Sequence, residues 1–196
     1  MNIRLCNFTS MLNWVSNFFY RIADRRLSVR FFLLELVFLI VIWPWCERWI
    51  GLPESKTRLL DVCFGFTPDM AYQMLNSYGD PGRHRYAVAT LLVDGVYPLV
   101  YTGLLVFLLT ILLSGIFSES SRWRMLNLWP LAALAADYAE NAGIFILLTN
   151  FPDRLDGVAV WASIAGMAKW TAVISALVLL ILLAVKRLYN RIINNH

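Results

Sequence analysis

Long apolar stretches, separated by short polar segments, occupy most of the chain. Four of them are long enough to cross a membrane, since a helix needs about 20 apolar residues to span the hydrocarbon core. They cover residues 31–50, 86–116, 125–150 and 158–185. The second stretch exceeds what a bilayer requires, so we expect that helix to tilt or to project beyond the membrane surface. The pattern predicts an all-α, polytopic membrane protein that forms a four-transmembrane-helix bundle.

Two segments outside the spans also carry helical patterns. Residues 1–30 precede the first span, and apolar side chains within 8–26 recur on one helical face, which is typical of an amphipathic helix lying on a membrane surface. The outer loop, residues 51–85, contains a short helix that Thr67 begins as its N-cap and that we expect to end at Gly79. All 196 residues are therefore expected to form a single membrane domain.

Composition and charge agree with a membrane location. The chain is 59% hydrophobic and 15% charged, with a mean hydropathy of +0.61, whereas a soluble domain carries about a quarter charged residues. Soluble enzyme folds are thereby excluded. The formal net charge of +4 is explained by membrane orientation and by attraction to anionic lipids, so we expect membrane lipids, and no nucleic acid, as partners.

The basic residues lie mainly on one side of the predicted bundle. That side holds ten of them against the acidic Asp24 and Glu119, whereas the other side holds six basic and seven acidic residues. Because Lys and Arg are retained preferentially in the cytoplasm, both termini are predicted to be cytoplasmic, in what we expect to be a bacterial inner (plasma) membrane. The ten basic residues are Arg4, Arg21, Arg25, Arg26, Arg30, Arg122, Arg124, Lys186, Arg187 and Arg191.

Five ionisable residues fall within the predicted spans, namely Glu35, Asp94, Asp137, Glu140 and Lys169. A charge at the centre of a bilayer costs roughly 2.5–3.5 kcal/mol on insertion scales, so such groups usually face the bundle interior, where they are paired, protonated or functional. Glu35 lies close to the cytoplasmic end of its helix, and we expect its carboxylate to reach interfacial water.

The third span places three polar side chains on one face. Asp137, Glu140 and Asn141 are spaced i, i+3 and i+4, which brings them together near mid-membrane. Lys169, the only cation in the spans, lies at comparable depth in the fourth helix, beside Trp170. Small residues on both helices allow a close approach. We therefore expect Lys169 to bridge to Asp137 or Glu140.

The second span contains a proline that interrupts its backbone hydrogen bonds. Pro98 has no N–H to donate to the carbonyl of Asp94, so a kink with a free acceptor is predicted there. Tyr97 and Tyr101 share the Asp94 face. Either these phenols cap a polar kink that fixes packing, or polar residues of three helices line one cavity open toward the outer leaflet. That cavity would contain Asp94, Tyr97, Tyr101, Asp137, Glu140, Asn141, Lys169 and Trp170.

Arg83, His84 and Arg85 lie at the outer start of the second helix. Basic side chains and free helix N-terminal amides both favour anions, so these three residues form a candidate site for a lipid headgroup phosphate. Interfacial basic residues also serve simply to anchor a helix, which is the alternative here.

The chain lacks the signatures of a metal or cofactor enzyme. His84 has no second internal histidine with which to ligate a metal, and dinucleotide-binding, Walker, serine-hydrolase and Cys-x-x-Cys motifs are absent. We therefore expect no metal and no cofactor. Cys46 and Cys63 fall on the predicted outer side, where a disulfide between them is one alternative.

Several short motifs carry a resemblance to known membrane proteins. They are Gly82-Arg83-x-x-Tyr86, Asp94-x-x-Tyr97-Pro98-x-x-Tyr101, Asp137-x-x-Glu140-Asn141 and Lys169-Trp170. Across residues 65–175 they resemble a group of small four-helix membrane proteins to which no activity is attached. The architecture is also similar to that of the sterol isomerase and sigma-2 receptor superfamily, whose members bind amphipathic cations or sterols. The isomerases pair a Glu with an intramembrane His that this chain lacks, so the resemblance does not imply isomerase activity.

The first functional hypothesis is a binding or transport-type protein that is not an enzyme. Its acidic cavity would receive an amphipathic, cationic or lipid-like small molecule. Glu140 and Asp137 would supply the counter-charge, and Tyr97, Tyr101 and Trp170 the aromatic walls. Asn141 would orient the ligand. Four spans are few for a transporter, so transport would need a homodimer.

Two other functions are compatible with the sequence. In the first, the protein is an intramembrane enzyme in which Asp94 and Glu140 act as acid and base on a lipid or isoprenoid, with Arg83 and Arg85 holding the headgroup. In the second, it is a structural or assembly subunit of a membrane complex, and its polar residues only join helices to one another or to a partner.

Overall fold

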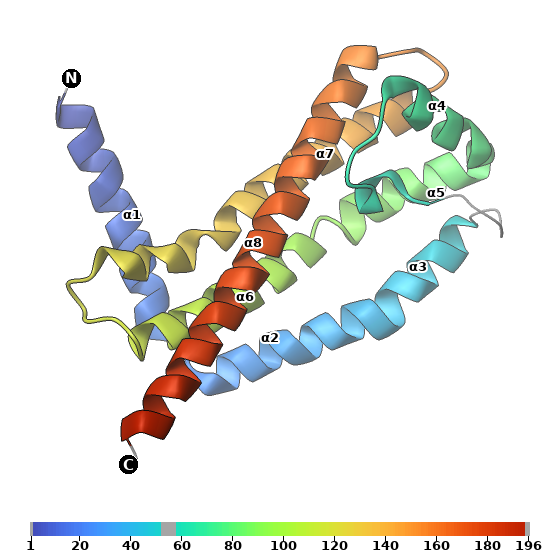
Figure 1. The fold of residues 1–196 in the computed structure, drawn as a ribbon. Coiled ribbons are helices and arrows are strands. Elements are labelled where there is room, and N and C mark those ends of the chain that lie inside the picture. The colour runs from blue at the N-terminus through green and yellow to red at the C-terminus, as the bar shows by residue number, and fades with distance from the viewer. Residues whose placement is uncertain (1, 52–57, 195–196) are drawn as a thin grey trace.

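The computed structural model describes residues 2–51 and 58–194, with side chains described from Thr9 to Ile193. Residues 52–57 of the predicted outer loop lie outside these ranges. Within them every regular element is helical (Figure 1). The α-helices are α1 (Asn2–Ile22), α2 (Arg25–Val37), α3 (Trp43–Ile50), α4 (Pro68–Ser77), α5 (Gly79–Leu92), α6 (Tyr97–Ser114), α7 (Pro130–Asn150) and α8 (Asp156–Asn194). The shorter elements are the π-helical η1 (Phe38–Ile42) and the 3-10 helices η2 (Leu60–Val62) and η3 (Arg122–Leu128).

The described residues contain four helical segments that are long and apolar enough to cross a membrane, which confirms the predicted number. The first span joins α2, η1 and α3, the second α5 and α6, the third η3 and α7, and the fourth is α8. Their bounds are Arg25–Ile50, Gly79–Ser114, Arg122–Asn150 and Asp156–Ile193. The second span therefore begins well before the apolar stretch that predicts it.

Local sequence signals explain where several helices begin and end. The Asp24 side chain accepts a hydrogen bond from the Leu27 amide at 2.5 Å and caps α2. Thr67 likewise caps α4 by accepting from the Met70 amide at 3.2 Å, and Gly79, with φ of +64°, follows its last turn. The predicted start and end of the short outer helix are therefore confirmed.

Prolines interrupt the first two spans. In the first, the turn before Pro44 widens to η1, and the Trp43 amide donates to the carbonyl of Phe38, five residues back. In the second, the predicted kink is a complete break, because α5 ends at Leu92 and α6 begins only at Tyr97, next to Pro98.

Side chains of α7 satisfy the carbonyls that this break exposes. Asn141 Nδ2 donates to the carbonyl of Asp94 at 3.4 Å, and the Tyr138 hydroxyl donates to that of Gly95 at 3.0 Å. A free carbonyl in hydrocarbon is costly, so these bonds make the break tolerable at membrane depth. The free acceptor predicted at Asp94 is thus present and has a partner.

The third and fourth spans form the closest helix pair, with α7 and α8 packed antiparallel (Figure 1). A Cβ on Gly143 would lie only 2.7 Å from the Cβ of Ala162 across this interface. α6 packs on both helices and also on α2, where the ring of Phe31 covers Gly103. The predicted close approach of the third and fourth helices is therefore confirmed.

α1 leaves the line of the spans and extends sideways from the end of the bundle that holds the C-terminus (Figure 1). One of its faces is attached to this end, because Ser16 Oγ donates to Asn127 Oδ1 at 2.8 Å and the Tyr20 hydroxyl donates to the carbonyl of Arg124 at 3.0 Å. An apolar strip on another face is exposed. It consists of Met11, Trp14, Phe18 and Ile22.

The glycine at the α7–α8 contact gives a test of this packing. Gly143→Ala should lower the free energy of unfolding by about 1–3 kcal/mol, since the added methyl group forces two backbones apart. Gly157→Ala is the matched control, because a Cβ there meets no atom within 4 Å. Unfolding of the detergent-solubilised protein measures both. Equal stability of the two variants would contradict the close α7–α8 contact.

Candidate functional site

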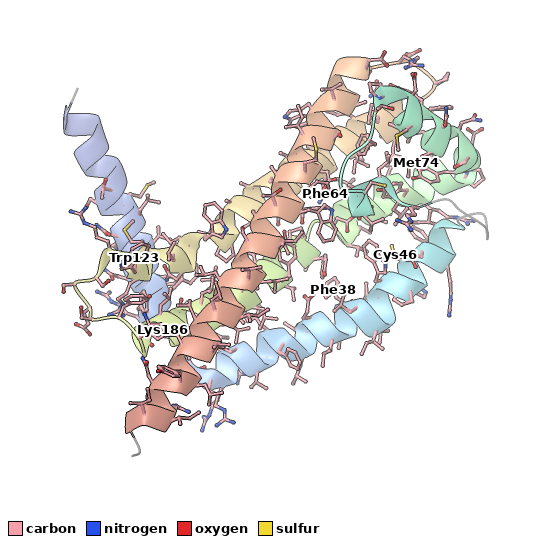
Figure 2. All side chains as sticks on the ribbon, in the orientation of Figure 1. Phe38, Cys46, Phe64, Met74, Trp123 and Lys186 are labelled. Atoms are coloured by element: carbon pink, nitrogen blue, oxygen red, sulfur yellow. The ribbon has the colours of Figure 1, made fainter. Side chains whose placement is uncertain are left out.

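A cavity of about 400 Å³ lies inside the bundle. Its walls come from all four spans and from η2, and most of the lining is aliphatic or aromatic. Figure 2 shows Phe38 on the side of the first span that faces the other helices, where its ring lies 5.2 Å from that of Tyr97. The charged residues in the lining are Glu35, Asp61, Asp94, Asp137 and Lys169.

The Lys169 ammonium lies at the centre of the charged groups. Its Nζ is 2.5 Å from Glu140 Oε2 and 3.9 Å from Asp137 Oδ1, and it donates to the backbone carbonyl of Asp61 at 2.8 Å. The predicted bridge from the fourth span to the third is therefore confirmed, with Glu140 as the nearer partner.

Glu140 lies behind this ammonium and does not line the cavity. Its side chain is fully buried and rests against α8 at Gly166, where a Cβ would collide with the carboxylate. The glycine is therefore required for the carboxylate to reach Lys169. Because Glu140 balances the charge of Lys169, the carboxylates that face the cavity have no other ammonium within the described residues that line it.

Asp137 is oriented by two hydrogen bonds. The Tyr101 hydroxyl donates to its Oδ2 at 2.8 Å, and Asn141 Nδ2 donates to its Oδ1 at 3.1 Å. Asn141 also reaches the Asp94 carbonyl, so it lies behind the cavity wall as a brace and is not part of the lining.

The structure corrects the expectation for Glu35. Its carboxylate faces the cavity and accepts a hydrogen bond from the Tyr97 hydroxyl at 3.0 Å, so it does not turn toward interfacial water. Among the described residues its second oxygen, Oε2, is buried without a hydrogen-bond partner. The phenols of Tyr97 and Tyr101 are thus both used by carboxylates other than Asp94, and neither caps the kink.

Asp94 contributes the least satisfied carboxylate of the cavity. The residue is only 8% exposed, lines the cavity, and makes no side-chain hydrogen bond to any described residue. A buried carboxylate without a donor is costly, so this position favours a donor or a cation supplied by an occupant of the cavity.

Sequence reasoning missed Asp61, which it placed in the outer loop. The structure brings η2 into the bundle between α5 and α8, where the Tyr86 hydroxyl donates to Asp61 Oδ1 at 2.7 Å (Figure 1). The Phe66 amide, which follows η2, donates to Ser163 Oγ of α8 at 2.8 Å. The available signal was an apolar run, 59–66, that contains one acidic residue and is too short to span a membrane.

The cavity is acidic and aromatic. Among the described residues four carboxylates face it, whereas the one ammonium in the lining is already paired with Glu140. The rings of Tyr97 and Tyr101 lie 5.5 Å apart, and Trp170 is 5.2 Å from Lys169 Nζ. Carboxylates and aromatic faces both attract cations in a medium of low dielectric. The arrangement can therefore hold a positively charged group whose remaining surface is apolar.

The candidate headgroup residues lie away from this cavity, and two of them join helices at the end of the bundle that was predicted to be the outer one. Arg83 pairs with Asp80, donates to the carbonyl of Leu75 at 2.9 Å and lies over the Phe151 ring at 4.0 Å. Arg85 donates to the carbonyl of Trp49 at 3.0 Å, and His84 is exposed.

The outer cysteines are not joined. Cys46 and Cys63 are free thiols, so the disulfide alternative is wrong. Burial raises the pKa of the Cys63 thiol and the neighbouring Asp61 carboxylate adds to the shift, which keeps this thiol protonated. The part of the chain that the structure describes holds no group of three His, Cys, Asp or Glu side chains suited to a metal ion.

The buried ion pair predicts a specific stability pattern. Lys169→Met should lower the free energy of unfolding by about 3–5 kcal/mol, because it leaves Glu140 buried without a counter-charge. Adding Glu140→Leu to this variant should restore much of that loss. Unfolding titrations of the single and double variants in detergent measure the coupling, and additive losses would contradict a direct pair.

Comparisons of the chain with models of known protein families, with curated proteins and with solved structures find no match.

Proposed function

We propose that this integral membrane protein binds an amphipathic cation in its intramembrane cavity. The observation that carries the proposal is the carboxylate of Asp94, which has no hydrogen-bond partner among the described residues and faces a cavity that three further carboxylates also line. A bound ammonium group would supply the missing counter-charge, and the faces of the aromatic side chains would contact it. The apolar remainder of the ligand would cover the aliphatic part of the wall.

Two features support ligand binding over the alternatives. A purely structural role predicts polar groups that neutralise one another in a packed interior. Here Glu35 Oε2 has no hydrogen-bond partner among the described residues, and the Asp94 side chain makes no hydrogen bond to any of them, although both residues line a cavity. An acid–base role for Asp94 and Glu140 requires that both reach one substrate, yet Glu140 lies behind Lys169. Binding of a cation requires neither that the polar groups neutralise one another nor that Glu140 reaches the ligand.

The charge-sign preference of the cavity can be measured directly. Octyltrimethylammonium should raise the unfolding temperature of the protein in lipid nanodiscs, whereas octyl sulfate should not. At a ligand concentration of a hundred times Kd, the free energy of unfolding should rise by about 2.7 kcal/mol. Asp94→Asn should remove most of this stabilisation. Asp153→Asn is the matched control, because Asp153 is exposed in the α7–α8 turn. Stabilisation by both amphiphiles, or its persistence in Asp94→Asn, would contradict the proposal.

We also propose that both termini face the cytoplasm of a bacterial plasma membrane, with α1 on the inner leaflet. The excess of basic residues at that end of the bundle supports this orientation. The exposed apolar strip of α1 fits the acyl-chain boundary.

Thiol labelling tests the orientation. In a chain with its native cysteines replaced, Asp153→Cys should react with a membrane-impermeant maleimide added to intact cells. Glu119→Cys should react only after the membrane is permeabilised. The reverse pattern would place the termini outside.

A further inference from the structure

The cavity has an opening on one side, between the first span and α8. Leu39 and Leu177 line the cavity, yet 51% and 45% of their surfaces are exposed, whereas Leu104 and Leu105 in the α6 wall are buried. A side chain that is both exposed and part of the wall marks the rim of an opening. Leu39 belongs to η1 of the first span and Leu177 to α8, and Val62 of η2, which is 36% exposed, also lines the cavity, so the rim runs along these two spans and η2.

The helix packing explains why this side is open. The first span packs on α6 and, through α3, on α5, while α8 packs on α7 and α6. Across the described residues, no extensive packing joins the first span to α8, and α2 and α3 diverge from it in Figure 1. η1 lies at this point, and none of its residues is buried.

With these four helices across a bilayer, the opening would face lipid. Leu39 lies near the middle of the span Arg25–Ile50 and Leu177 near the middle of the span Asp156–Ile193, so both are at the depth of the hydrocarbon core. A molecule that passes between them enters from the acyl chains and not from water.

The polarity of the wall changes along α8. On α8, Lys169 lies at one end of the wall and Val173 and Leu177 follow toward the rim, whereas on the first span Glu35 also lines the cavity, one helical turn from Leu39. Eight residues of helix separate Lys169 from Leu177, which corresponds to about 12 Å. A ligand with its charge near Asp94 would therefore place its apolar part at the rim.

Resting on the cation site of the proposed function, we propose that the ligand is a long-chain amine taken from the bilayer. Its ammonium group pairs with Asp94, and its hydrocarbon chain leaves the cavity between Leu39 and Leu177 and continues among the lipid chains. The chain length is then not limited by the volume of the cavity.

Three probes test this in the full-length protein in phosphatidylcholine nanodiscs: hexadecylamine, butylamine and hexadecanol. Hexadecylamine should raise the unfolding temperature at an aqueous concentration at least about tenfold lower than the concentration at which butylamine does so. The reason is that its hydrocarbon chain concentrates it beside the opening. Hexadecanol should have no effect, since it lacks the charge. Protection by butylamine but not by hexadecylamine would mean that the cavity is closed and would overturn the inference. Protection by neither amine would instead contradict the cation site itself.

A variant at the rim separates passage of the chain from accumulation in the bilayer. Leu177→Trp should raise, by about threefold or more, the hexadecylamine concentration needed to stabilise the protein, because the larger side chain narrows the exit. The butylamine concentration needed should not change. Val178→Trp is the matched control, since Val178 is equally exposed on α8 but does not line the cavity. Leu39→Trp with Ile40→Trp as its control repeats the comparison on η1. Equal effects of rim and control variants, or of a rim variant on both amines, would overturn the lateral exit.

Discussion

The interior of this protein depends on the contacts of the Lys169 ammonium group. It contacts carboxylates of α7 and a backbone carbonyl of η2, so one cation ties three separate elements together inside the membrane. None of these groups is stable alone in hydrocarbon, and each becomes tolerable only through the others. Because Glu140 is the nearest carboxylate to Lys169, Asp94 and Glu35 face the cavity without a cation of their own among the described residues.

The cavity lies where the helices are interrupted. η1 widens the first span, residues 93–96 break the second, and η2 enters from the segment between the first two spans. Irregular backbone occurs at membrane depth only where protein side chains or a polar cavity satisfy its hydrogen-bonding groups. Here Asn141 and Tyr138 satisfy the carbonyls of the break, and Tyr86 holds Asp61. The interruptions keep neighbouring helices from closing on one another, which leaves space for an occupant.

Sequence patterns predicted a large part of this cavity but not its complete wall. Asp94 and Asp137 are on helix faces that their spacing already directs inward, and both line the cavity. Glu35 was assigned to the membrane surface because its distance from the helix end allowed this, but the aromatic contact of the first span with α6 turns it toward Tyr97. The position of Asp61 in the cavity wall was not predicted, because hydropathy windows detect segments long enough to cross the bilayer and miss a short segment that only packs against the helices.

The number of spans, the helix caps and the proline kink were determined by the sequence alone. Each depends on residues close together in the chain, through transfer to hydrocarbon, a capping side chain or a missing N–H. Tertiary structure alone decided which carboxylate received Lys169, which remained without a partner, and on which side the cavity opened. These outcomes depend on how each helix is rotated and how closely it packs. In the α7–α8 pair, Gly143 and Gly166 permit contacts that no local pattern specifies.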